Sequence, residues 1–423
     1  MAVESKIETS YRLAREIYAE LGVDTDAVLK TLAQIPISLH CWQGDDVAGF
    51  EHEGGGISGG GILATGNYPG RARNGNELRQ DLEIALSLIP GQSRLNLHAM
   101  YAETNGRAVE RDQITVAHFQ QWIAWAKERQ IGIDFNPSFF SHPRAASGFT
   151  LSSKDSAVRR FWIEHAKRCR AIGAAMGEAL NTPCVHNLWI PDGSKDLPLD
   201  RLGHRQILKE ALDEIFEQQY SQDYLLDSVE SKLFGIGSEA FVVGSHEFYM
   251  GYALQNHIML CLDMGHFHPT EGIADKISAL LPFTKRLLIH VSRGVRWDSD
   301  HVTILNDDLM ALAQEVLRSR ALNNVYFALD FFDASINRIT AWVTGARALQ
   351  KALLLALLEP TELLLAEEQA GNNGNRLALL EECKTLPFGA VWQKYCLDQT
   401  ATAGREWLDK IGDYEDQVLT NRF

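Results

Sequence analysis

The chain has 423 residues, 22% of them charged, and a formal net charge of −15. This is the composition of an ordinary globular protein, and the length is enough to bury a large core. An acidic surface repels the phosphate backbone of nucleic acids, so we expect no nucleic-acid partner. The sequence has no run of about 18 apolar residues, so we also expect no membrane span.

The predicted compartment is the cytoplasm. Six cysteines are scattered along the chain without a CxxC pair. In a chain of this length they indicate reduced, buried thiols rather than a disulfide framework, a zinc ribbon or a redox motif. The N-terminal segment MAVESKIETSYRLAREIY lacks the apolar core of a signal peptide, which favours the same compartment.

Taken in chain order, residues 5–34 predict two short amphipathic helices, with Gly22 as a stop and Asp24 as the second N-cap. Short apolar runs then alternate with helical patterns such as 76–89 and 118–130. The runs that predict strands cover residues 37–43, 94–100, 132–140, 183–190, 228–234, 257–266, 286–292 and 324–332. Eight strands alternating with helices favour an α/β fold with a closed (β/α)8 TIM barrel. The alternative is an open doubly wound sheet, which would usually show a glycine-rich dinucleotide turn after its first strand.

Two further segments frame the predicted barrel. A glycine-rich stretch (53–70) lacks the GK[ST] ending of a phosphate loop, so we interpret it as a mobile loop over the barrel mouth rather than a nucleotide cradle. Residues 334–357 predict the last barrel helix, and the remainder is helical with a polar break at 370–376. We therefore predict an N-terminal helical segment (1–35), a catalytic barrel (36–357) and a C-terminal helical extension (358–423).

Each of the last four predicted strands carries one ionisable residue in an apolar run: Glu230, Asp263, His290 and Asp330. Strands rarely bury a charge unless it is paired or bound to a metal, although a single buried aspartate is commonly a structural hydrogen-bond acceptor. In a closed barrel these strand ends converge, and three carboxylates so close repel unless a divalent cation neutralises them. One histidine and three carboxylates suit a metal of intermediate hardness, such as Mn²⁺, Zn²⁺ or Co²⁺.

A second set of candidate ligands lies just beyond these strands. Asp298 and Asp300 form an Asp-x-Asp pair, which by itself fits a capped turn as well as a cation site. Because the first set of candidate ligands lies nearby, we favour metal binding by this pair. His266 is the expected third ligand, since three residues after Asp263 the chain is still over the barrel mouth. A supporting or substrate-binding role fits His268 as well as ligation does.

Candidate substrate contacts come from other strand ends. Lys232 follows Glu230 by two residues, so in a strand both side chains would face the same way, where Lys232 could bind a substrate oxygen or pair with a carboxylate. Trp189 and His98 close two other predicted strands, and such aromatic and donor groups are typical of sugar pockets, with core packing as the alternative. Neither a GxSxG elbow nor an HExxH helix is present, which favours metal-centred chemistry over covalent catalysis.

Long motifs along essentially the whole chain resemble those of the bacterial L-rhamnose isomerase family. They are HCWQGDDVAGFE (40–51), ATGNYPGRARN (64–74), RLNLHAMY (94–101), DFNPSFFSHP (134–143), WIPDG (189–193), VESKLFGIG (229–237), CLDMGHFHPTE (261–271), HVSRGVRWDSDH (290–301), LDFFDASINR (329–338) and ALLEP (356–360).

The resemblance implies a (β/α)8 barrel that forms homotetramers and interconverts L-rhamnose and L-rhamnulose, the first step of L-rhamnose catabolism. It implies a structural metal site at Glu230, Asp263, His290 and Asp330, and a catalytic site, with Mn²⁺, at His266, Asp298 and Asp300. It also implies a metal-assisted hydride shift, with a metal-bound water or hydroxide moving the proton.

Several roles within this scheme remain hypotheses from the sequence. An enediol route, with Asp300 or a bound hydroxide as the base, stays open. Lys232 would stabilise the oxygen on C1, Asp298 would also contact the sugar, and Val47 and Ile62 would contact its C6 methyl group. Two other classes of protein remain possible. One is a metal-dependent phosphodiesterase, which would need a basic face for DNA, and the other is a non-catalytic sugar-binding or metal-storage protein.

Overall fold

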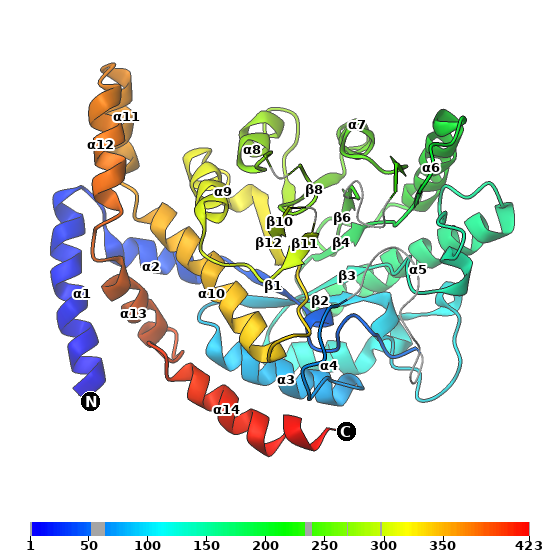
Figure 1. The fold of residues 1–423 in the computed structure, drawn as a ribbon, viewed down its shortest axis with the longest axis horizontal. Coiled ribbons are helices and arrows are strands. Elements are labelled where there is room, and N and C mark those ends of the chain that lie inside the picture. The colour runs from blue at the N-terminus through cyan, green and yellow to red at the C-terminus, as the bar shows by residue number, and fades with distance from the viewer. Residues whose placement is uncertain (1, 52–63, 233–238, 269, 297, 423) are drawn as a thin grey trace.

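The fold is a closed barrel of eight parallel strands wrapped by helices, seen in a computed structural model (Figure 1). The structure describes residues 2–51, 64–232, 239–268, 270–296 and 298–422, and of residues 2, 3, 298 and 299 it describes the backbone alone. The strands follow one another around the barrel in the order β1, β12, β9, β8, β6, β4, β3, β2. Their bounds are β1 Ile37–His40, β2 Ser93–His98, β3 Ile133–Asn136, β4 Cys184–Leu188, β6 Leu225–Glu230, β8 Met259–Asp263, β9 Leu287–Val291 and β12 Val325–Leu329.

This closure confirms the predicted TIM barrel over the open-sheet alternative. The predicted runs extend beyond the strands at the barrel mouth, because apolar residues continue into the loops there. After β1 the chain turns into a 3-10 helix at Cys41–Gln43, and after β2 into another at Ala99–Tyr101. β3 stops at Asn136 because Pro137 follows and cannot donate a ladder hydrogen bond.

Helices cover the outside of the barrel. The barrel helices are α3 Gly75–Leu88, α4 Gln120–Arg129, α5 Ser156–Leu180, α6 Arg201–Phe216, α7 His246–Asn256, α8 Ala274–Leu280, α9 Asp307–Arg318 and α10 Arg338–Leu357. Two small antiparallel sheets accompany the barrel. One pairs β5 (Gly193–Ser194) with β7 (Phe241–Val242), and the other is a hairpin of β10 (Arg293–Val295) and β11 (Asp298–His301).

An apolar plug, a buried cluster separate from the main core between strands and helices, lies inside the barrel beside a cavity lined by polar residues such as Arg94 and Asp134. It consists of Val185, Leu226, Met259, Cys261, Leu288 and Ala328. These residues lie on five consecutive strands. Cys261 and Leu288 each stand two positions before an ionisable residue on the same strand, and Ala328 stands two positions before Asp330, which directly follows β12. Because side chains in a strand alternate between faces, the ionisable residues point into the barrel directly above the plug.

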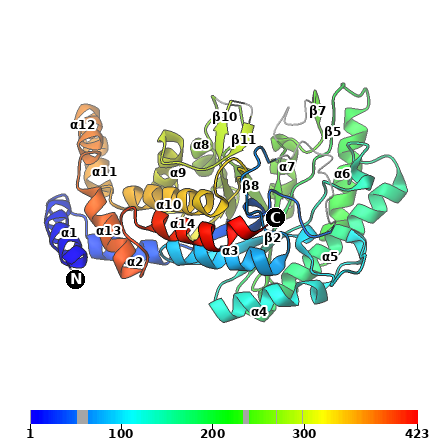
Figure 2. The ribbon, with the colours of Figure 1, turned by 60° about the horizontal axis from the view of Figure 1, so that its bottom comes forward.

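The terminal segments form a helical layer on one side of the barrel (Figures 1 and 2). The N-terminal helices are α1 Ala2–Glu20 and α2 Thr25–Ala33, which confirms the predicted pair, with Asp24 capping the second. The C-terminal helices are α11 Thr361–Gln369, α12 Asn373–Cys383, α13 Phe388–Asp398 and α14 Trp407–Gln417. A buried ion pair between Arg422 and Asp81 of α3, 2.6 Å between Nη1 and Oδ2, fixes the C-terminus on the barrel. Among the described helices, none combines the length and apolar character that a membrane crossing needs.

Candidate metal and sugar site

The floor of the site is a cluster of one imidazole and three carboxylates from four adjacent strands. Glu230, Asp263, His290 and Asp330 each offer one ligand atom, and these atoms all lie within 4.8 Å of one another. Parallel register brings them together, since Asp263 pairs with His290 across β8 and β9. Nδ1 of His290 lies 3.1 Å from Asp330 and 3.3 Å from Glu230. The four residues that the sequence predicts as one set are therefore one set in space.

Neighbouring groups hold the three carboxylates in fixed orientations. Trp42 Nε1 donates to Asp330 across 3.0 Å, and Asn187 donates its amide to Glu230. Asp263 accepts from Ser292 Oγ at 2.8 Å and from the backbone N–H of Gly265 at 2.6 Å. Such outer contacts orient metal ligands in known sites. The second oxygen of each carboxylate faces His290 at the centre of the cluster.

The charge balance of the cluster fits a divalent cation. Burial, together with the neighbouring carboxylates, raises the pKa of Asp263 to about 6. Burial disfavours charge on His290, yet the acidic groups around it raise its pKa well above the usual value. Glu230 Oε1 and both ring nitrogens of His290 have no hydrogen-bond partner among the described residues. A cation bound between them would replace the imidazole proton and supply the missing partners.

The second predicted set stands at the rim of this floor. His266 Nδ1 lies 2.8 Å from the carbonyl oxygen of Ser231, so a proton on Nδ1 leaves Nε2 as the ligating nitrogen. Asp300 is carried by the β10–β11 hairpin, whose position is fixed where Phe332 donates its N–H to the Asp300 carbonyl at 3.1 Å. The Asp298 side chain lies outside the described residues. Both His266 and Asp300 border the same cavity as Glu230, His290 and Asp330.

That cavity fills the barrel mouth, and its wall is aromatic on one side. The lining includes Trp42, Val47, His98, Asn136, Phe140, Asn187, Trp189 and Phe332 above the ionisable floor. Burial lowers the pKa of His98 to about 3, so its imidazole is neutral. The indole N–H of Trp189 is buried without a hydrogen-bond partner in the described structure. Flat apolar faces with a few polar groups suit a small polyhydroxylated ligand.

Comparison with known proteins places this site in a family. The family model described as "L-rhamnose isomerase (RhaA)" matches residues 5–422. The chain belongs to the L-rhamnose isomerase family. It is 57% identical to an L-rhamnose isomerase of Rhodopirellula baltica over 98% of this chain and 97% of the relative. It is also 57% identical to one of Pectobacterium carotovorum over 99% of this chain and 100% of that one.

Membership of the L-rhamnose isomerase family makes this chain a metal-dependent aldose–ketose isomerase. It decides against the phosphodiesterase and the non-catalytic binding protein. Among solved structures, an L-ribulose 3-epimerase is 11% identical with a TM-score of 0.46, covering 76% of this chain and 95% of that chain. This likeness is too distant to add to the fold described above.

The predicted substrate contacts Lys232 and Val47 lie in different surroundings. β6 ends at Glu230, so the strand alternation that would point Lys232 the same way stops before it. The Lys232 ammonium instead donates to the carbonyl of Pro191 at 2.8 Å and pairs with Glu239, and it is not among the residues that line the cavity. Val47 does line the cavity, whereas Ile62 lies outside the described residues.

Two features of the L-rhamnose isomerase site escape prediction from the sequence. In the sequence, Asn187 and Trp42 are recognisable only as a polar and an aromatic residue near strand ends. Their hydrogen bonds to Glu230 and Asp330 form only in the folded barrel. Cys261 is a buried thiol, as predicted, but its sulfur also lies within 4.8 Å of the candidate ligand atoms of Glu230 and His290. The sequence offers one indication of this contact. Cys261 stands two residues before Asp263, which places both side chains on the inner face of β8.

Proposed function

We propose that this protein interconverts L-rhamnose and L-rhamnulose in the cytoplasm, with Mn²⁺ as the catalytic cation. The observation that carries the proposal is the cluster of Glu230, Asp263, His290 and Asp330 beneath an aromatic-walled cavity in a chain of this family. Its acidic and imidazole donors suit Mn²⁺, and Zn²⁺ or Co²⁺ suit the same donors.

We assign the two donor sets different tasks. Glu230, Asp263, His290 and Asp330 hold a structural ion, because the first three are buried and neighbouring side chains hold the carboxylates in place. The rim residues His266, Asp298 and Asp300 hold the catalytic ion. When bound, that ion polarises the sugar carbonyl and acidifies the neighbouring hydroxyl.

Side chains around the cavity would bind the sugar and assist the transfer of its protons. Trp189 and His98 hold the sugar against the wall, where the unpartnered indole N–H of Trp189 can donate to a hydroxyl. Asp300, which lines the cavity at the rim, would move the proton between the oxygens on C1 and C2. The hydrogen on carbon moves between C2 and C1 as a hydride. Lys232 would stabilise the C1 oxygen after its ammonium rotates away from Glu239 and Pro191.

The sugar's methyl end would meet the loop after β1. Val47 faces the cavity, and with Ile62 it is assigned to the C6 methyl group. We further propose that residues 36–357 act as the catalytic domain between the helical segments 1–35 and 358–423. The apolar residues exposed on those segments, such as Leu13 and Leu377, support assembly into a homotetramer. Light scattering at working concentration tests the tetramer, and a monomer mass would contradict it.

Turnover of labelled sugar tests both the substrate and the route. The Mn²⁺-loaded protein should convert L-rhamnose to L-rhamnulose, and absence of turnover would refute the proposed substrate. With deuterium at C2, a hydride shift keeps the label and places it on C1 of the product. Loss of the label to water would instead establish the enediol route with a base such as Asp300.

A further inference from the structure

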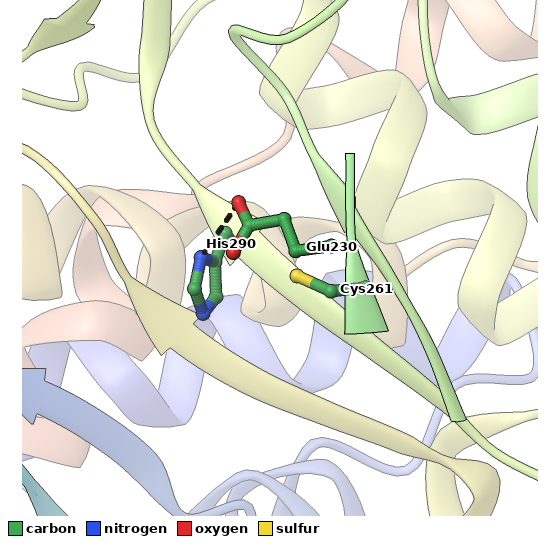
Figure 3. Close-up of side chains that lie close together, drawn as sticks. All are labelled: Glu230, Cys261 and His290. Carbon is green, nitrogen blue, oxygen red and sulfur yellow. Dashed lines mark ion pairs between the residues drawn. The ribbon is translucent and has the colours of Figure 1, made fainter. Parts of the chain in front are cut away.

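A thiol belongs to the proposed metal site. Glu230, Cys261 and His290 form a second set whose ligand atoms all lie within 4.8 Å of one another, and Figure 3 shows the Cys261 sulfur pointing toward the other two side chains. Cys261 is 1% exposed and pairs in register with Glu230 across β6 and β8. The second set shares Glu230 and His290 with the first and exchanges Asp263 and Asp330 for sulfur.

We propose that these three residues form an alternative, sulfur-containing cation site that takes a thiophilic divalent ion such as Cd²⁺. It rests on the proposed structural metal site and deepens it. Because Glu230 and His290 serve both sets, one ion at a time occupies the floor. A hard ion such as Mn²⁺ uses the carboxylates, and a soft ion moves one layer down to Cys261.

The surroundings of Cys261 support a soft ion at that depth. Cys261 is a member of the apolar plug, together with neighbours such as Leu288 and Ala328, so an ion that reaches its sulfur leaves most of its water behind. Mn²⁺ prefers oxygen ligands, whereas Zn²⁺ and Cd²⁺ gain from a thiolate. When the ion binds, the Cys261 thiol loses its proton to solvent and the sulfur becomes a ligand.

The ligand atoms that face this position make ion pairs but no hydrogen bonds with other described residues. Within the described residues, Glu230 Oε1 and both ring nitrogens of His290 are buried and have no hydrogen-bond partner. Glu230 is 2% and His290 2% exposed, so solvent does not supply partners. Glu230 Oε1 and His290 Nδ1 stand 3.3 Å apart as an ion pair (Figure 3), a separation that one cation can bridge.

Cadmium titration of the full chain tests the proposal. Chelator-treated wild-type protein is titrated with Cd²⁺, with equilibrium dialysis to report binding and ultraviolet sulfur-to-cadmium charge transfer to report the thiolate. We expect the charge-transfer band in the wild type and in Cys184→Ser, a control buried in β4, and its loss in Cys261→Ser. Cadmium binding without charge transfer in the wild type would overturn the sulfur ligand and leave the proposed metal site standing. Absence of any cadmium binding would overturn both.

Metal competition gives a second readout. Cys261→Ser should weaken Cd²⁺ binding by at least about tenfold and leave Mn²⁺ binding unchanged. An equal loss for both ions would show that Cys261 only packs the barrel, and would overturn the proposal. Should Cys261→Ser fail to fold by circular dichroism, X-ray absorption at the cadmium edge of the wild type decides. One sulfur neighbour is expected, and a shell of oxygen and nitrogen alone would refute the site.

Discussion

The indole Nε1 of Trp42 donates a hydrogen bond across 3.0 Å to Oδ1 of Asp330, which links the turn after β1 to the end of β12. Only the closing of the barrel brings these residues together, because β1 and β12 are its first and last strands and pair in parallel. The same indole forms part of the cavity wall. One side chain therefore serves both the sugar pocket and the orientation of a proposed metal ligand.

Trp42→Phe should weaken metal binding at the barrel floor. Phenylalanine keeps the aromatic wall and removes the donor, so Asp330 loses its orientation toward the other ligands. Loss of such an outer hydrogen bond typically lowers metal affinity about 10- to 100-fold. Equilibrium dialysis with Mn²⁺ measures it. Trp122→Phe is the control, because Trp122 donates to the Tyr101 carbonyl in the core and should leave metal affinity unchanged.

Removal of the metal should lower the melting temperature as well as abolish activity. Without a cation, the carboxylates Glu230, Asp263 and Asp330 have His290 and the nearby His266 as their ionic partners among the described residues. A ligand at 100 times its dissociation constant stabilises the native state by about 2.7 kcal/mol. Calorimetry across a Mn²⁺ series should therefore give a melting temperature that rises with metal concentration. A constant melting temperature would refute a structural ion.

Mutations in the two donor sets should have different effects on stability and on activity. Asp330→Ala removes a partner of His290 in the barrel floor, and breaking a buried ion pair costs roughly 3–5 kcal/mol. Asp300→Asn at the rim keeps the volume, so the fold should survive while turnover falls at least about a hundredfold. Thermal unfolding and L-rhamnose turnover in excess Mn²⁺ measure both. If Asp300→Asn kept near-normal turnover or unfolded as readily as Asp330→Ala, the division into structural and catalytic sites would be wrong.

The sequence predicts most of this architecture because barrel strands carry their signal locally. Runs such as 286–292 are apolar on both sides of His290, and a single ionisable residue in such a run indicates a candidate ligand from the sequence alone. The strand ends are less predictable, since apolar residues continue past β1 and β2 into the 3-10 helices that shape the mouth.

Contacts between distant segments could not be predicted in the same way. The hydrogen bond from Lys232 to the Pro191 carbonyl lies beyond the end of β6, where alternation within the strand predicts nothing. The hydrogen bond from Asn187 to Glu230 depends on β4 and β6 being neighbours. In the sequence, each of these residues is compatible with capping or core packing. Its role can be assigned only when its hydrogen-bond partner in the fold is known.

Asp45 should make stability depend on pH below neutrality. Burial raises its pKa from 3.8 to about 7, against the hydrogen bonds that it accepts from Tyr101 and the Gly49 N–H. Between these two values the unfolded chain has lost the proton and the native chain keeps it. The Asp45 carboxyl therefore lowers the free energy of unfolding as the pH rises from about 4 to about 7, with no further loss above about pH 7.

Asp45→Asn isolates this effect. The amide can accept from Gly49 and donate to the Tyr101 oxygen, so it imitates the protonated acid. Melting temperatures between pH 5 and 8 should show a shallower decline for the variant than for the wild type. Parallel curves would mean that Asp45 does not titrate in this range.

Val47 occupies a strained position in the cavity wall. It and Asp46 both have φ of 60°, a region that β-branched side chains rarely adopt. The turn is held by Arg338, which donates to both Asp46 carboxylate oxygens at 2.7 Å, and by the Val47 N–H, which donates to the Trp42 carbonyl. Strain that neighbouring contacts maintain in this way is common where a side chain must face a ligand.

Val47→Ala should therefore change specificity more than stability. If Val47 contacts the C6 methyl group, the variant loses an apolar contact worth about 10-fold or more in kcat/KM for L-rhamnose. L-lyxose has the same configuration without the sixth carbon, so its kcat/KM should stay nearly constant and the ratio between the two sugars should narrow.

The comparison with a second valine separates this effect from packing. Val316→Ala removes the same atoms from a buried position in α9 and should lower the melting temperature without altering the ratio. Val47→Ala should lower the melting temperature less than Val316→Ala does, because alanine tolerates the positive φ better than a β-branched residue. An unchanged ratio in Val47→Ala would show that the sugar's methyl group binds elsewhere in the cavity. A melting temperature that falls as far as in Val316→Ala would show that the turn stores no strain.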